Sequence, residues 1–145
     1  MRRVQITALL LGALALVAAC GSGEKKPVIG GEGTVIVDGK PLDLPKDRVS
    51  CETSDGQVSI SIGAEKDTAG AGVVVTDGPK PELLTVGFSG VGGMTIGYAK
   101  DVGNGSGTVV KTGNRYTITG EATAINMAHP EQAGRKRFEI TARCP

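Results

Sequence analysis

The sequence predicts a mainly β protein, a single domain of curved antiparallel sheet that forms a half-open barrel or a sandwich. Short apolar and β-branched runs alternate with Asp-Gly and Gly-Asn pairs, which are typical of tight turns between antiparallel strands. No segment shows the sustained 3.6-residue period of an amphipathic helix. Glycine is abundant, at 23 of 145 residues, and glycine within strands bends a sheet. We therefore expect at most one short helix.

The first 19 residues predict a secretory signal peptide. Arg2 and Arg3 precede an apolar run from about Val4 to Ala19, which is the layout of an export signal. This run is shorter than the roughly 20 apolar residues that a helix needs to cross a bilayer. A permanent membrane span is therefore disfavoured, and residues 1–19 are interpreted as a cleaved leader.

The end of this leader matches the lipobox of bacterial lipoproteins. Val17 is followed by Ala18, Ala19 and Cys20, which gives an aliphatic residue, two small residues and then cysteine. Small residues fit a signal-peptidase cleft, and the Cys20 thiol can take a diacylglyceryl group as a thioether. Two acyl chains hold a protein stably on a membrane, whereas one binds only reversibly. The pattern predicts Cys20 as an anchor on the outer face of the cell membrane; the alternative is an ordinary leader with an incidental cysteine.

Residues 20–33 are predicted to be the lipidated N-terminus and a flexible tether, because glycine, proline and charge follow one another without periodicity. Residues 34–145 are predicted to form the β domain. Its runs of strand character are 34–39, 48–54, 58–64, 71–78, 82–88, 94–99, 107–125 and 136–144. The run 107–125 reads as a hairpin that turns at Gly113-Asn114, and 126–134 could hold one short helical turn.

Three Asp-Gly pairs separate early runs, and they predict recurrent tight turns: Asp38-Gly39, Asp55-Gly56 and Asp77-Gly78. Gly87 and Gly97 lie inside runs of strand character. Because glycine inside a strand often marks a bulge, we expect bulges at these two positions.

Two cysteines remain after Cys20, and an even remainder in an exported chain predicts a Cys51–Cys144 disulfide. In a strand, Cys51 shares a face with Val49 and Cys144 shares one with Ile140, so both thiols would point inward. The alternative is two buried free thiols. With 3% aromatic residues and no tryptophan, the domain would be marginal without the bridge.

Composition gives no reason to expect nucleic acid as a partner. Removing Arg2 and Arg3 from the 16 basic residues leaves 14 against 15 acidic ones. His129 is the one histidine and lies in a loop-like stretch, and no Gly-x-Ser-x-Gly elbow supplies a serine nucleophile. Zinc needs more His and Cys ligands than remain, and no glycine-rich segment continues as a phosphate-binding loop. We expect no catalytic residue, no metal site and no cofactor.

Residues 135–137 are a short basic run, Arg-Lys-Arg. The plainer interpretation is a solvated entrance to the last strand. The alternative is a contact with anionic lipid or with a partner surface, because a short tether would keep the domain near a membrane.

The order of six segments carries a family resemblance. These are Val35 to Lys40, Val49 to Gly63, Val73 to Phe88, Thr95 to Ala99, Tyr116 to Pro130 and Lys136 to Cys144. With its anchor motif, the chain resembles the mycobacterial 19 kDa lipoprotein antigen (LpqH) family. The resemblance implies a surface lipoprotein of the actinobacterial envelope without catalytic activity, recognised through acylated Cys20 by the host Toll-like receptor that senses lipopeptides. The short tether here departs from the long, glycosylated Thr/Ser-rich tether of relatives.

Two functions follow from these observations. The first is a non-catalytic surface lipoprotein that engages host or envelope partners through its acylated N-terminus and its β domain. The alternative is a carrier that holds a hydrophobic envelope ligand in a cavity of the curved sheet, where few bulky side chains are available to fill the concave face.

Overall fold

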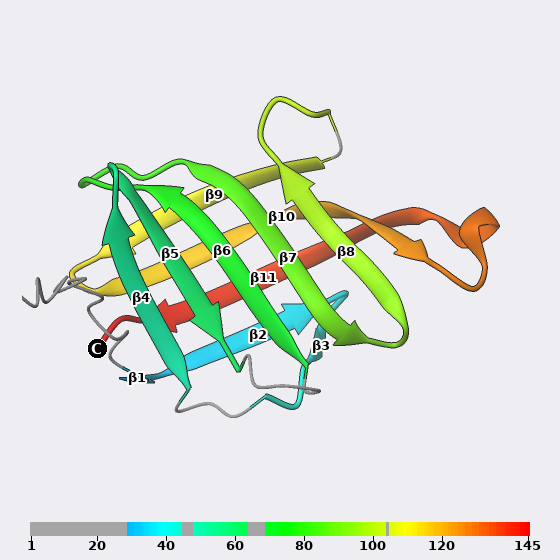
Figure 1. The fold of residues 1–145 in the computed structure, drawn as a ribbon, viewed down its shortest axis with the longest axis horizontal. Coiled ribbons are helices and arrows are strands. Elements are labelled where there is room, and N and C mark those ends of the chain that lie inside the picture. The colour runs from blue at the N-terminus through cyan, green and yellow to red at the C-terminus, as the bar shows by residue number, and fades with distance from the viewer. Residues whose placement is uncertain (1–28, 45–47, 64–68, 104) are drawn as a thin grey trace, which may run out of the picture.

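The computed structural model describes residues 29–44, 48–63, 69–103 and 105–145. They form one antiparallel sheet of 11 strands that curls into a half-barrel, which confirms the predicted fold class (Figure 1). The strands are β1 (Ile29–Gly31), β2 (Gly33–Val37), β3 (Lys40–Pro41), β4 (Val49–Ser54), β5 (Gln57–Ile62), β6 (Gly70–Thr76), β7 (Leu83–Val91), β8 (Met94–Ala99), β9 (Gly105–Thr112), β10 (Arg115–Asn126) and β11 (Gly134–Arg143). Their order is β1-β4-β5-β6-β7-β8-β10-β11-β2-β3, and β9 pairs with β10 beside this path.

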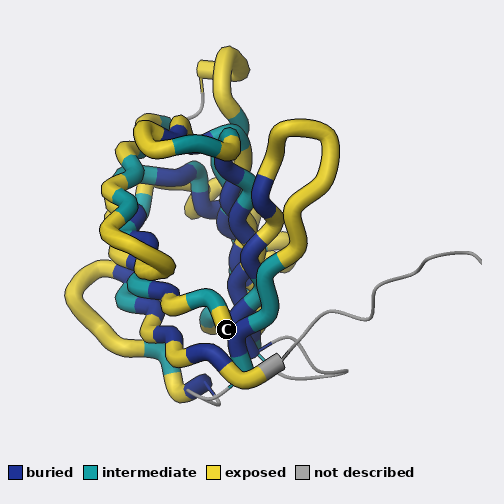
Figure 2. Tube along the Cα trace, turned by 90° about the vertical axis from the view of Figure 1, so that its left-hand side faces the viewer, coloured by how far each residue is buried: buried dark blue, intermediate teal, exposed yellow. Residues whose placement is uncertain are grey.

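The curl places two layers of the sheet against each other. Strands β4 to β8 cross in front of β9, β10, β11 and β2 (Figure 1). The long strand β10 connects the layers, because residues 115–122 pair with β9 and residues 123–126 pair with β8. Buried positions of the two layers face each other, and exposed positions lie mainly in the turns and on the outside (Figure 2).

The space between the layers is filled mainly by aliphatic side chains. The largest side chains with less than 2% exposure are Ile60, Ile62, Ile96, Ile118, Ile140, Val35, Val49, Val73 and Val75. Two aromatic rings join the layers, since Phe88 of β7 meets Phe138 of β11 with ring centroids 5.5 Å apart. Buried apolar surface stabilises a domain by about 25 cal/mol per Å², whether it is aliphatic or aromatic. The aliphatic side chains therefore supply the hydrophobic free energy that few aromatic residues are present to give.

Two of the three Asp-Gly pairs form the predicted tight turns. Asp38 and Gly39 have φ of 49° and 75°, and Asp55 and Gly56 have φ of 52° and 74°. Positive φ at both central residues matches the right-handed twist of a two-residue hairpin. Asp77-Gly78 differs, because it opens a longer connection between β6 and β7 instead of a tight hairpin.

The prediction of bulges at Gly87 and Gly97 is wrong. These glycines lie opposite each other in the ladder between β7 and β8, and the irregularity falls between Phe88 and Val91. Gly90 has a φ of +73° there, and a Cβ at Gly90 would lie 2.7 Å from Cα of Ala69. The irregularity therefore lies at Gly90, where the backbone has a positive φ and passes close to Ala69. The presence of glycine in a strand does not by itself show which glycine occupies such a position.

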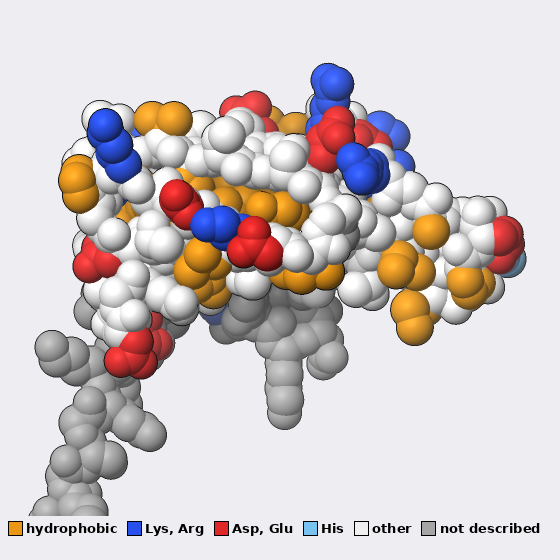
Figure 3. All heavy atoms as spheres, turned by 90° about the horizontal axis from the view of Figure 1, so that it is seen from above, with side chains coloured by type: hydrophobic (Ala, Val, Ile, Leu, Met, Phe, Trp, Pro, Cys, Tyr) orange, Lys and Arg blue, Asp and Glu red, His pale blue; other side chains and the backbone are white. Residues whose placement is uncertain are grey.

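The structure also shows strands within the predicted tether. β1 and the start of β2 occupy residues 29–33, so the domain begins before Thr34. These glycine-rich residues pair through the backbone, and such pairing needs no apolar pattern. At the other end of the half-barrel, the β10–β11 hairpin projects beyond the body of the domain (Figures 1 and 3). One 3₁₀ turn at Pro130–Gln132 lies in this hairpin, where a helical turn was predicted.

Candidate functional site: the junction of tether and domain

The predicted lipidation site lies outside the described residues. Val17, Ala18, Ala19 and Cys20 all precede Ile29, where the described chain begins. The signal peptide, its cleavage before Cys20 and the lipid anchor on Cys20 therefore stay predictions. What the structure describes is the point at which the chain enters the folded domain.

Three segments of the chain meet at this junction. β1 pairs with β4 at Gly31 and Val49, and the backbone N–H of Arg143, at the end of β11, donates to the carbonyl of Glu32 at 2.7 Å. A Cβ at Gly31 would collide with the Arg143 carbonyl oxygen, so only glycine permits this approach. The entering chain is therefore fixed between the first and last parts of the sheet.

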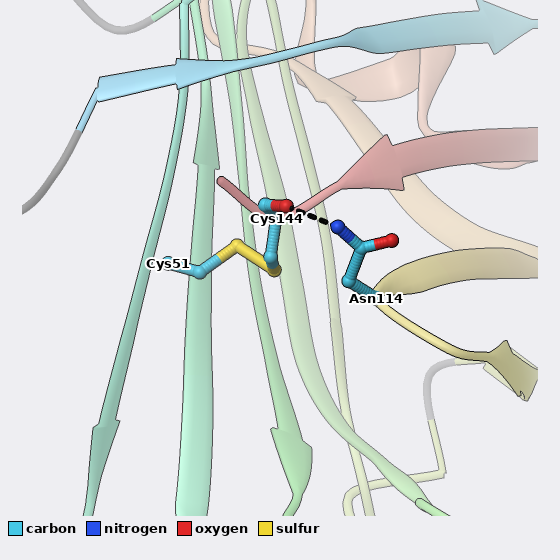
Figure 4. Close-up of a disulfide and its surroundings, with 3 residues drawn as sticks. All are labelled: Cys51, Asn114 and Cys144. Carbon is cyan, nitrogen blue, oxygen red and sulfur yellow. Dashed lines mark hydrogen bonds between the residues drawn. A yellow bond between two sulfur atoms is a disulfide. The ribbon is translucent and has the colours of Figure 1, made fainter.

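The predicted disulfide lies at the same junction (Figure 4). We call the boundary between β1 and β4 on one side and the end of β11 on the other the seam. Cys51 of β4 is bonded to Cys144, which follows β11, with their Cα atoms 5.7 Å apart. Both residues are half-buried and pack against the hydrophobic core. The bridge therefore covalently ties the end of the chain to the strand that pairs with β1.

Asn114 also holds the end of the chain in place. Its Nδ2 donates to the carbonyl oxygen of Cys144 at 2.8 Å, and the Cys144 N–H donates to the Asn114 carbonyl at 2.9 Å (Figure 4). The Gly113-Asn114 pair predicts only a turn at this position. No local signal could have identified its second role, because its partner is 30 residues away.

The basic run 135–137 is largely paired within the domain. Lys136 Nζ lies 2.9 Å from Asp38 Oδ2, and Arg137 Nε lies 3.4 Å from Glu121 Oε1. Two hydrogen bonds lower the pKa of Asp38 below its ordinary value. The one from the Lys136 side chain has the larger effect, and the one from the Arg137 backbone N–H has a smaller effect. These contacts favour the plainer interpretation of Lys136 and Arg137 as a solvated strand entrance.

Within the described ranges, no three His, Cys, Asp or Glu side chains gather closely enough to hold a metal ion. His129 lies at the surface of the β10–β11 hairpin, with Nδ1 3.2 Å from Glu131 Oε1. Glu82, just before β7, pairs with Lys100, just after β8, and the hydrogen bond from Lys100 lowers the pKa of Glu82. No helix among the described residues has the length and apolar character needed to span a bilayer.

The hollows in the described surface open to solvent. One of about 460 Å³ lies on the outer side of the β9–β10–β11–β2 layer. Its lining is mixed, with Ile36 and Phe138 beside polar residues such as Thr119, Glu121 and Arg137. Another of about 330 Å³ lies where Leu83 and Tyr98 approach β9. The ligand carrier stays a prediction, and the described residues between the layers include many buried aliphatic side chains.

Comparison with known proteins gives a consistent set of matches. A family model described as Mycobacterium 19 kDa lipoprotein antigen matches residues 26–144. Lipoprotein LpqH of Mycobacterium tuberculosis is 40% identical over 110 residues, which cover 76% of this chain and 67% of that protein. Lipoprotein LpqH of Mycobacterium avium is 40% identical over 110 residues, with 76% and 66% covered. A putative lipoprotein of Mycobacteroides abscessus is 33% identical over 154 aligned positions and covers 99% of both chains. The matched residues include every strand described above.

Proposed function

The chain belongs to the Mycobacterium 19 kDa lipoprotein antigen family, and on that premise we propose that it is a lipid-anchored surface lipoprotein of the cell envelope. Acyl chains on Cys20 hold it at the outer face of the cell membrane. The observation that carries this proposal is the use of its cysteines. The chain has three, and Cys51 and Cys144 are joined to each other, so Cys20 is the thiol left for acylation.

The position of β1 limits how far the domain can stand from its anchor. Residues 21–28 separate Cys20 from Ile29, the first residue of β1. An extended chain advances at most about 3.3–3.6 Å per residue, so this spacer reaches no more than about 30 Å. Since the junction fixes the entering chain to the sheet, the proposed anchor keeps the domain close to the membrane surface.

The proposed role is binding and not catalysis, which agrees with the family's description as a lipoprotein antigen. The acylated N-terminus engages the host Toll-like receptor that senses bacterial lipopeptides, and the β domain is displayed to host or envelope partners. Acyl chains bury apolar area in proportion to their length, so removing them abolishes recognition at that receptor. Reporter cells that express this receptor measure its activation. They should respond to the acylated protein and not to the Cys20→Ala variant.

Detergent phase partitioning tests the anchor directly. Wild-type protein made in an actinobacterial host is expected in the detergent phase, and the Cys20→Ala variant in the aqueous phase. The matched control is Cys51→Ala/Cys144→Ala, which removes two cysteines and leaves the anchor, so it should partition like the wild type. Equal partitioning of the wild type and Cys20→Ala would refute the proposal.

A further inference from the structure

The β10–β11 hairpin presents apolar side chains that the core does not use. We call residues 125–134 the hairpin tip. Met127 is 74% exposed and Ile125 is 39% exposed, and no residue of the 3₁₀ turn Pro130–Gln132 is buried. Figure 3 shows hydrophobic side chains gathered on this projecting end of the molecule. Single exposed apolar residues are ordinary, whereas a group of them on one projecting element is typical of an interaction site.

The hairpin tip is held in shape by its own hydrogen bonds. The N–H of Ala128 donates to Asn126 Oδ1 at 3.0 Å, and the N–H of His129 donates to the Asn126 carbonyl at 3.1 Å. The N–H of Gln132 donates to the His129 carbonyl at 2.9 Å. Backbone groups that are paired within the segment cost less to move into an apolar medium. The tip is therefore suited to rest in a poorly hydrated environment without refolding.

The tip and its border carry charge of both signs. Glu131 lies within the tip with its Oε1 3.2 Å from His129 Nδ1, and Arg135 borders the tip. Arg135 follows the tip directly and is exposed, and no acidic side chain in the described part of the chain pairs with it. The next two basic residues differ, since Lys136 pairs with Asp38 and Arg137 with Glu121. Apolar side chains next to an unpaired arginine match the boundary between acyl chains and anionic headgroups.

We propose that the hairpin tip is a second membrane contact of this chain, in which Ile125 and Met127 enter the headgroup boundary and Arg135 contacts lipid phosphate. The proposal rests on the proposed anchoring at Cys20. The tip lies at the opposite end of the half-barrel from β1 and the C-terminus, where the tether joins (Figure 1). A spacer of about 30 Å at one end and an inserted tip at the other would hold the domain flat on the bilayer.

Two other exposed apolar residues provide matched controls. Val102, in the β8–β9 connection, is 68% exposed, and Val110 on β9 is 62% exposed. They lie on other elements, away from the hairpin tip. If exposure of an apolar residue alone brought it to the bilayer, Val102 and Val110 would insert as readily as Met127.

Site-specific fluorescence on the acylated protein tests the proposal. Met127→Cys, Val102→Cys and Val110→Cys each add one free thiol, since Cys51 and Cys144 are bridged and Cys20 is acylated in this account. Each labelled protein is reconstituted into vesicles of phosphatidylethanolamine and phosphatidylglycerol with brominated lipid as quencher. Blue-shifted, quenched emission is expected at position 127 and unquenched emission at the two controls.

The remaining outcomes separate the two proposals. Protein that floats with the vesicles without quenching at position 127, or with equal quenching at all three positions, overturns the membrane contact and leaves the anchor intact. A blue shift at 127 without quenching indicates contact with a second copy of this chain and also overturns the membrane contact. Protein that does not float refutes the anchoring and with it this proposal. Adding Arg135→Gln should weaken the quenching at 127, whereas Arg137→Gln should preserve it; equal effects would contradict the role of Arg135.

Discussion

Removing the disulfide should destabilise the domain by several kcal/mol. Cys51 and Cys144 are 93 residues apart in sequence, and the chain-entropy model assigns a loop of that length about 4.7 kcal/mol at 25 °C. Native bridges in small exported domains are typically worth about 2–5 kcal/mol. We therefore expect Cys51→Ala/Cys144→Ala to lose about 3–5 kcal/mol of unfolding free energy. That is a large part of the roughly 5–15 kcal/mol that stabilises an ordinary domain.

The structure also predicts where the effect appears first. β1 and β4 share only the register pairs Ile29–Ser50 and Gly31–Val49, whereas β10 and β11 pair continuously from Arg115 to Ala124. Without the bridge, the seam depends on this short ladder. Amide hydrogen exchange should therefore accelerate first in β1 and β4, through local opening, before it reaches the centre of β10 and β11.

Urea unfolding of the wild type, the double variant and chemically reduced wild type measures the free energy. The reduced protein separates loss of the bond from loss of the sulfur atoms, and Cys20→Ala provides a cysteine control that keeps the bridge. A loss below about 1 kcal/mol in both bridge-free proteins would refute the reasoning, because it would mean that the bridge hardly restricts the unfolded chain. Uniform acceleration of exchange across the sheet would contradict the assignment of the seam as the weak point.

Three further predictions concern the sheet itself. Ile118→Ala should cost about 2–5 kcal/mol in urea unfolding because Ile118 is 0% exposed, while Val110→Ala, at a 62% exposed position, should change the free energy by less than about 0.5 kcal/mol. Similar losses in both would contradict the assignment of the core. Gly31→Ala should cost about 1–3 kcal/mol because its Cβ meets a backbone carbonyl of β11; an unchanged midpoint would refute that close approach. Glu82 should titrate below its ordinary pKa of 4.5, so its contribution to stability is present above that pH and is lost as pH falls through the lowered pKa; Lys100→Met should return the NMR-detected pKa to normal, and no change would exclude the ion pair.

The features that could be predicted from the sequence are those set by local chemistry. The turns at Asp38-Gly39 and Asp55-Gly56 follow from the positive φ that these residue types tolerate. The disulfide followed from count and strand phase, since only Cys51 and Cys144 remained to pair. In each case the signal lies within a few residues of the feature or in the whole-chain count of one residue type.

The features that could not be predicted depend on distant segments. The glycines before Thr34 indicated a tether, but they pair with β4 and contact the end of β11, neither of which is local. β10 changes partner along its length, from β9 to β8, before the hairpin tip begins, and no residue pattern within β10 marks that change. The set of buried side chains likewise results from the crossing of two layers, which composition alone does not reveal.

The central claim is that this sheet is held to a bilayer through Cys20 while Cys51 and Cys144 hold its seam closed. Intact and fragment mass spectrometry of protein from an actinobacterial host tests both parts in one experiment. We predict a chain that starts at Cys20, carries at least a diacylglyceryl group on that residue, and contains the bridged Cys51–Cys144 pair. A retained leader, or an unmodified residue 20 in protein taken from the membrane fraction, would contradict it.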